Sequence, residues 1–255
     1  MRLYHYTTID AFARIWVSNQ LKFSTNLRLN DPFEKSKPYS IPFHKTYAHH
    51  FFELVEQFDK IYSKIISSYQ QISFSKDDKG AYNGFASPAM WGHYAHNENG
   101  VCIELDSAKI PSFSKIVKKR SVIYTKNLPA QTYKLENGIS EDAIKHYVRE
   151  HIKELFFMKH RHWRYENEYR IIAQSNEELF LPLGDAIQGI YVCSRAGANT
   201  EFVKKLVKDQ VPLYVLCNAI TKGVRLLDRD LINLKDDTTN SKPTTITDVL
   251  QRFYN

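Results

Sequence analysis

The chain has 255 residues, of which 43% are hydrophobic and 25% are charged, so it can bury a sizeable core and is not a disordered polymer. Lysine and arginine number 35 against 28 aspartate and glutamate, and the net charge of +7 favours polyanionic partners such as a dinucleotide or a nucleic acid. The three cysteines form no Cys-x-x-Cys pair, which argues against structural zinc and for a reducing compartment. No stretch is typical of a signal sequence or a membrane span, so we expect a cytoplasmic protein.

The chain opens with a predicted strand over residues 2–6 that carries a pair of polar side chains. His5 and Thr7 are two residues apart, so they point to one face of the strand, where a nucleotide ribose could be bound. The plainer interpretation is a buried histidine and a threonine that caps the next helix, because apolar residues follow at helical spacing: Ile9, Phe12, Ile15 and Trp16. A second strand is predicted over residues 20–24.

Two long amphipathic helices are predicted, over residues 44–70 and 140–161. The loop before the first contains Leu29-Asn-Asp-Pro-Phe-Glu34, whose Asn, Asp and Pro suit a turn or a helix cap. This loop either closes a cleft or serves as scaffolding.

A short helix that begins after Ser87 carries four aromatic or imidazole side chains, Trp91, His93, Tyr94 and His96. His93 and His96 are close enough in sequence to share a metal ion, but no third ligand is evident, so we predict no metal site. Strands are expected at Ile72–Ser75 before this helix, and at Gly100–Leu105 and near residues 121–125 after it.

Residues 164–173 alternate as a strand does, with Glu166, Glu168 and Arg170 on one face. In one interpretation these are the solvent face of an edge strand, where Arg170 neutralises the carboxylates. In the other they project into a cleft, where a carboxylate stabilises the oxocarbenium-like charge that develops when an N-glycosidic bond breaks. A ring such as Trp91 or Tyr94 could then stack on the leaving base.

The rest of the chain gives weaker signals. Basic runs at residues 115–120 and 159–164 are expected to be solvated. Strands near 187–193 and 212–217 bracket a helix at 197–209. With no internal repeat and no strong shift in composition, we predict one α+β domain over residues 1–235, with a helical insertion at 44–70 and a polar, threonine-rich tail at 236–255.

Several of these motifs occur together, in the order in which they resemble the bacterial Domain of Unknown Function 2971 (DUF2971) family. They run from residue 3 to about residue 200 and comprise Leu3-Tyr-His-Tyr-Thr7, Leu29-Asn-Asp-Pro-Phe-Glu34, Ile72-Ser-Phe-Ser75, Met90-Trp-Gly-His-Tyr-Ala95 with Gly100-Val-Cys-Ile103, and Trp163-Arg-Tyr-Glu-Asn-Glu-Tyr-Arg170.

The same motif order resembles the ADP-ribosyltransferase superfamily in its His-Tyr-Glu form. The resemblance implies split mixed and antiparallel sheets with flanking helices, and NAD as co-substrate. It implies catalytic roles for His5 on the ribose, Tyr94 on nicotinamide and Glu168 at the transition state. The residues implied around NAD are His5, Tyr6, Thr7, Ser75, Trp91 and Glu166. Ser73, Ser75, Tyr6 and Tyr124 remain alternatives for the tyrosine position.

Three functions follow as hypotheses. The first is an NAD-using ADP-ribosyltransferase-like enzyme that modifies a protein or nucleic acid, with a toxin or phage-defence effector among the candidates. The second is a non-catalytic nucleotide- or RNA-binding module that uses the two basic runs. The third is an inactive scaffold in which His5 and Glu168 pair in the interior and Trp91 and Trp163 belong to the core. The sequence assigns no membrane association and no oligomeric state.

Overall fold

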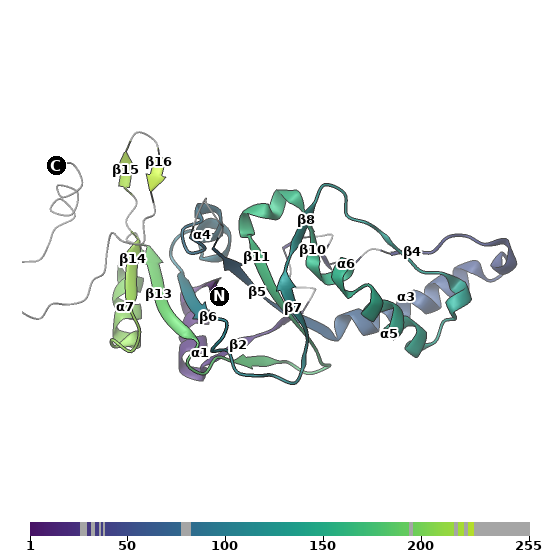
Figure 1. Cartoon of the computed structure of the whole chain (residues 1–255), viewed down its shortest axis with the longest axis horizontal. Coiled ribbons are helices and arrows are strands. Elements are labelled where there is room, and N and C mark those ends of the chain that lie inside the picture. Colours follow the sequence, from purple (N-terminus) through teal and green to yellow (C-terminus); the bar gives the residue numbers. More distant parts are fainter. Residues whose placement is uncertain are drawn as a thin grey trace, which may run out of the picture. The chain divides into compact units, whose positions relative to one another are not determined.

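The structure is a computed structural model, and it describes residues 1–25, 30–31, 34–35, 37, 39–77, 83–193, 196–216, 219–221 and 224–226 (Figure 1). The predicted tail at 236–255 and part of the Leu29–Glu34 loop lie outside the described residues. The chain divides into two compact units, each described here by itself. Unit 1 comprises Met1–Ser18, Asp77–Lys109 and Asp185–Asn255, and unit 2 comprises Asn19–Lys76 and Ile110–Gly184.

Unit 1 contains a mixed sheet of four strands in the order β14-β13-β6-β1. The pairs β1–β6 and β6–β13 are antiparallel, and β13–β14 is parallel. The strands are β1 (Arg2–Thr7), β6 (Val101–Asp106), β13 (Ile187–Cys193) and β14 (Leu213–Leu216), followed by a hairpin of β15 (Ala219–Thr221) and β16 (Val224–Leu226). The helices are α1 (Ile9–Ser18), α4 (Pro88–Tyr94) and α7 (Ala198–Val207).

Aromatic rings fill part of the core of unit 1. The ring of Tyr191 stacks on Phe85 with 4.4 Å between centroids, and on Tyr214 at 4.8 Å. Trp91 packs edge-on against Tyr6 at 5.3 Å. These contacts fix α4 over the sheet, because the indole is 1% exposed and its N–H donates to the carbonyl of Phe85 at 2.7 Å.

Unit 2 contains an antiparallel sheet in which β11 (Glu168–Gln174) lies between β5 (Tyr69–Lys76) and β7 (Ile116–Ser121), and β3 (Ser24–Thr25) pairs with β5. The other strands of unit 2 form three short pairs, which are β2 (Gln20–Lys22) with β12 (Phe180–Pro182), β4 (Tyr39–Ser40) with β9 (Gln131–Thr132), and β8 (Ile123–Thr125) with β10 (Met158–His160).

The helical part of unit 2 packs α3 (Phe51–Ser67) against α5 (Glu141–Glu150), with α6 (Ile152–Phe157) following directly (Figure 1). Among the described residues, short 3₁₀ helices accompany them at η2 (Lys45–Tyr47), η3 (Leu135–Asn137) and η4 (Arg161–Glu166). A cluster of buried rings, Phe58, Tyr62, Tyr133 and Tyr147, joins the two long helices to the segment between them. Apolar residues spaced three or four apart on both helices produce this contact.

The α+β class is confirmed, with a mixed sheet in unit 1 and an antiparallel sheet in unit 2. The helix predicted over 44–70 is shorter, since residues 45–47 are 3₁₀ and α3 begins at Phe51. The helix predicted over 140–161 is wrong at its end. His151 ends α5 with φ −101° and ψ 18°, α6 adds six residues, and the chain then becomes β10. Within the described residues, no helix has the length and apolar character that crossing a membrane requires.

The turn between α4 and β6 depends on Gly100. His96, Asn97 and Glu98 have φ values of 48°, 52° and 71°, and this left-handed turn brings the amide of Gly100 to 2.7 Å from the carbonyl oxygen of Ala95. A Cβ at position 100 would lie 2.2 Å from the carbonyl oxygen of Thr7, which is backbone and cannot rotate away. Only glycine fits there.

Gly100→Ala is therefore expected to lower the free energy of unfolding by about 2–4 kcal/mol, because the clash must displace β1 or the turn. Gly92→Ala is the matched control. Its Cβ meets nothing within 4 Å and it lies within α4, so we expect a gain of about 0.5–1 kcal/mol. Urea denaturation of both variants measures the two effects, and equal behaviour of the variants would contradict the close approach.

Candidate functional site

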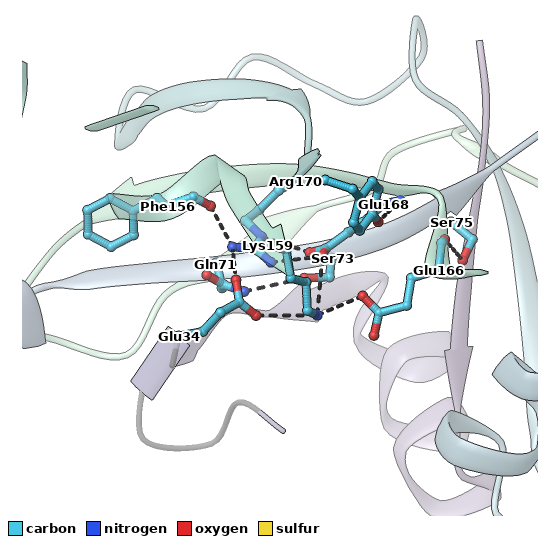
Figure 2. A network of polar contacts seen from close by, with 10 residues as sticks. Glu34, Gln71, Ser73, Ser75, Phe156, Lys159, Glu166, Glu168 and Arg170 are labelled. Atoms are coloured by element: carbon cyan, nitrogen blue, oxygen red, sulfur yellow. Dashed lines mark hydrogen bonds and ion pairs between the residues drawn. The ribbon is translucent and has the colours of Figure 1, made fainter. Parts of the chain in front are cut away.

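The side chain of Arg170, in the middle of β11, is completely buried in unit 2. Its Nε and Nη2 donate to the two carboxylate oxygens of Glu168 at 2.7 and 2.8 Å (Figure 2). Its Nη1 donates to Oε1 of Glu34 at 2.6 Å and to the backbone carbonyl of Phe156 at 2.5 Å. A buried guanidinium is tolerated only when its donors are satisfied in this way.

Lys159, the central residue of β10, is the second buried cation. Its Nζ lies 2.7 Å from Oε2 of Glu166, 3.3 Å from Oε2 of Glu34 and 3.7 Å from Oε2 of Glu168. The ammonium group also lies 4.7 Å from the centre of the Trp163 ring, which adds a cation–π contact. One lysine thus connects Glu166 and Glu168, which are two residues apart, with Glu34 from a distant part of unit 2.

We call these five residues, Glu34, Lys159, Glu166, Glu168 and Arg170, the charge network. Three carboxylates face two cations, so the network carries one net negative charge when all five groups are ionised. Each of the five is at most 4% exposed, which keeps bulk water from screening that charge.

Asn167 explains how Glu166 and Glu168, two carboxylates so close in sequence, both reach Lys159. It ends η4 with φ 41° and ψ 52°, a left-handed conformation that asparagine tolerates. Its side chain donates to the carbonyl of Lys76 at 2.9 Å. The backbone then continues into β11, where the amide of Glu168 donates to the hydroxyl of Tyr124 at 2.9 Å, while Ser75 Oγ donates to the carbonyl of Glu166 at 2.7 Å.

The charges set the protonation states of the network. Burial by itself raises the pKa of Glu34, but the charges of Arg170, Lys159 and the nearby Lys37 outweigh it and lower that pKa to about 2. Glu168 shows the same balance, and its pKa is lowered because Arg170 and Lys159 outweigh burial. The carboxylates in turn raise the pKa of both cations against the effect of burial. The two carboxylates therefore stay ionised at neutral pH.

Several sequence-based interpretations of this region are wrong. Glu166, Glu168 and Arg170 are not the solvent face of an edge strand, since all three are buried and β11 has a neighbour on each side. The strict alternation fails at Glu166, which belongs to η4. Lys159 is not solvated as its basic run suggested, because β10 turns it inward, whereas Lys118 and Lys119 are exposed as expected.

The network also contains residues that sequence reasoning had not placed in a site. Glu34 was assigned to a loop that closes a cleft or serves as scaffolding, and it in fact pairs with both buried cations. From the sequence, Lys159 is only part of a basic run, and it lies four residues before the motif Trp163–Arg170. The usable signal was the position of Glu34 at the end of the motif Leu29–Glu34, for which the sequence indicates no partner.

The other predicted site residues lie in unit 1. On β1, His5 is half-buried, Tyr6 donates from its hydroxyl to the carbonyl of Gly84 at 2.7 Å, and Thr7 is buried. Trp91 is buried in the aromatic core, and Tyr94 is half-buried at the end of α4. Unit 1 thus brings these five together on β1 and α4. Their convergence with Ser75, Glu166 and Glu168 of unit 2 stays a prediction.

Within the described residues, no group of three or more His, Cys, Asp or Glu side chains is arranged to hold a metal ion. His93 and His96, the pair considered from the sequence, lie at the end of α4 and in the following turn, both exposed.

Removing the central cation should be costly. Arg170→Met leaves Glu34 and Glu168 buried with Lys159 as their remaining ion-pair partner, so we expect a loss of about 3–5 kcal/mol in the free energy of unfolding. Arg161→Met, on the exposed side of η4, is the control and should change stability by less than about 0.5 kcal/mol. Urea denaturation compares them, and a small effect at Arg170 would contradict the network.

The lowered pKa of Glu34 predicts a pH dependence. Because the ordinary value is 4.5 and the folded value about 2, the unfolded chain binds the proton more readily as the pH falls through this window. The contribution of Glu34 is therefore complete above about pH 5 and is lost towards about pH 2, by at most about 1.4 kcal/mol per pH unit. The stability difference between the wild type and Glu34→Gln should shrink accordingly in acid, as followed by urea denaturation. A difference that is constant with pH would contradict the assignment.

Comparison with known proteins gives one solved structure and one family model that are similar to the chain. None of the curated proteins compared with the chain matches it. Among solved structures, Thermus sp. 2.9 DarT in complex with ADP-ribosylated ssDNA is similar at 14% identity over 84% of this chain and 92% of that chain, with a TM-score of 0.33. The model of the family described as "Protein of unknown function (DUF2971)" matches residues 90–171, a segment that includes residues 90–94 of α4 and, within the charge network, Lys159, Glu166, Glu168 and Arg170. The predicted resemblance to DUF2971 is therefore confirmed over residues 90–171.

Proposed function

We propose that this protein is an NAD-dependent ADP-ribosyltransferase-like enzyme that transfers ADP-ribose to a protein or nucleic acid. The observation that carries the proposal is the net negative charge of the buried network around Glu168. Breaking the bond between nicotinamide and ribose develops positive charge on the sugar, and an ionised carboxylate fixed beforehand stabilises that charge without having to reorganise.

The arrangement of Glu168 suits this role. Arg170 occupies one acceptor position on each of its two oxygens, and a carboxylate has about four such positions. Glu168 therefore keeps lone pairs for a ribose hydroxyl or an acceptor group while Arg170 fixes its orientation. Glu166, whose Oε2 binds Lys159, is the neighbouring carboxylate of the Glu-x-Glu pair.

The remaining roles follow the resemblance to the His-Tyr-Glu enzymes. His5 would bind the ribose, with Tyr6 and Thr7 beside it on β1. Tyr94 would stack on nicotinamide next to Trp91, and Ser75 would support the nucleotide from β5. A toxin or phage-defence effector is one setting in which such a transferase acts. These assignments require the two units to present their residues to a single NAD molecule.

The experiment is incubation of the purified chain with labelled NAD and a cell extract, with both nicotinamide release and labelled macromolecular product as readouts. Glu168→Gln should lower turnover at least about 100-fold and leave the Kd for NAD within about threefold, because the lost interaction belongs to the transition state. Glu56→Gln, an exposed carboxylate on α3, is the matched control.

Since Glu168→Gln also removes a charge from the network, circular dichroism must first show that the variant is folded at the assay temperature. Full turnover by the folded variant contradicts the role of Glu168. Absence of both products with the wild type, across extracts, contradicts the enzyme itself.

The alternative of a nucleotide- or RNA-binding module has one favourable observation, the exposed Lys118 and Lys119 on β7. The basic run at residues 159–164 gives this alternative less support, because Lys159 is buried and paired inside the charge network. This function predicts nucleic-acid binding with a steep salt dependence and no nicotinamide release.

A further inference from the structure

Lys37, close to Glu34 in unit 2, is a buried lysine whose charge acts on the network but whose amine makes no hydrogen bond with it. It is 2% exposed, and its Nζ has no hydrogen-bond partner. The backbone at Lys37 has φ 43°, and its carbonyl accepts a hydrogen bond from the hydroxyl of Tyr62 at 2.9 Å. A strained backbone held by a buried tyrosine and an amine with three unused donors is a combination that folding alone does not require.

The surroundings of this amine include a small cavity. Its volume is about 30 Å³, and Lys37 lines it together with the carboxylates of Glu34 and Glu154, the amide of Gln131 and four apolar side chains, Leu128, Pro129, Leu155 and Met158. A water molecule needs about 10–15 Å³ on this measure, so the space suits a molecule of two or three heavy atoms. On its other side the amine lies 4.8 Å from the centre of the Phe156 ring.

The charge state of the amine follows from this environment. Burial is the largest influence and lowers the pKa of Lys37 to about 7, aided by Arg170 and opposed by Glu34, Glu168 and Asp31. About half of the molecules therefore hold an uncharged amine at neutral pH. Exposed lysines, with a pKa near 10.4, hold almost none. An uncharged amine is nucleophilic.

The lining restricts what the cavity can hold. Anions are disfavoured by Glu34 and Glu154, and cations by Lys37 with Arg170 nearby. A small, neutral molecule therefore fits the lining, and the nucleophilic amine favours one that is electrophilic. We propose that Lys37 is a nucleophilic lysine that binds a neutral aldehyde or ketone of two or three carbons as an imine.

The step balances without any other reagent. The Nζ lone pair attacks the carbonyl carbon, so that a C–N bond forms and the π bond of the carbonyl opens to a carbinolamine. One amine proton moves to the oxygen as the carbinolamine forms. The carbinolamine then loses this hydroxyl group and the remaining amine proton as one water molecule, which leaves a C=N bond. Glu154, at the cavity, is the carboxylate placed to relay protons during the loss of water.

The test is reductive trapping with acetaldehyde and sodium cyanoborohydride at about pH 7, with mass spectrometry of the peptides. Lys37 should be ethylated at least about tenfold more than Lys35, an exposed lysine two residues away. In urea the two lysines should react equally, because the unfolded chain removes the effect of burial. Benzaldehyde, which is too large for the cavity, should lose the preference for Lys37.

Lys37→Arg is the control for position. It keeps a cation, forms no stable imine and should show only the background labelling of exposed lysines. Labelling of Lys37 no greater than that of Lys35 in the folded wild type overturns the proposal. The proposal is also overturned if benzaldehyde labels Lys37 over Lys35 by the same ratio as acetaldehyde does, since the cavity would then have no part in selecting the aldehyde. Neither result depends on NAD or on the proposed transferase activity.

Discussion

The burial of Arg170 is the constraint around which unit 2 is organised. Moving a guanidinium out of water costs several kcal/mol, and the cost is offset only where carboxylates and carbonyls meet its donors in good geometry. Glu168 supplies two acceptors from the same strand, but Glu34 comes from 136 residues away and the Phe156 carbonyl from the end of α6. The segment that contains Glu34, the end of α6 and the central strand β11 must therefore be in place together. A buried pair of this kind contributes more to selecting one arrangement than to net stability.

Lys159 extends the same constraint to a second strand pair. It lies on β10, whose parallel pairing with β8 turns its side chain towards the three carboxylates. Tyr124, on β8, accepts a hydrogen bond from the amide of Glu168, so β8 touches the network as well. The short β8–β10 pair would be a weak element alone. Its position is fixed by polar contacts with Glu168, the first residue of β11.

The sequence predicted the elements of this protein better than it predicted the site. Regular periodicity located α1, α3 and α7 and the buried strands, because burial of one face leaves a repeat that can be read directly. The end of the second long helix was missed, since Leu155 continues the spacing set by Ile144, Tyr147 and Val148 even though the backbone breaks at His151. A hydrophobic repeat indicates which face of a helix is buried. It does not reveal a break in the helix when the residues after the break bury the same face.

The site was only half predictable for a similar reason. The Glu-x-Glu-x-Arg pattern identified acidic and basic groups on one segment, but alternation assumes an unbroken strand, and the left-handed Asn167 breaks it just where Glu166 joins η4. Lys159 and Glu34 are brought together by the tertiary fold alone, and no local sequence pattern predicts that they form an ion pair. Charged residues are usually exposed, so a run such as 159–164 favours the solvated interpretation until the fold shows one member turned inward.

Glu34 links the network to the cavity beside Lys37, and the contrast between the two residues shows how contacts decide protonation in a buried site. Both side chains are almost fully removed from water, a change that disfavours charge on either. Glu34 touches two cations, which together outweigh burial and keep it ionised. The amine of Lys37 interacts electrostatically with Glu34 but makes no hydrogen bond. Burial therefore outweighs the attraction of the carboxylate, and the pKa of Lys37 is lowered. The two environments lower both pKa values, but with opposite results: the Glu34 carboxylate stays charged, and the Lys37 amine becomes neutral and reactive. Such a separation of a charged group from a neutral one is the property by which acid–base and nucleophilic sites are recognised.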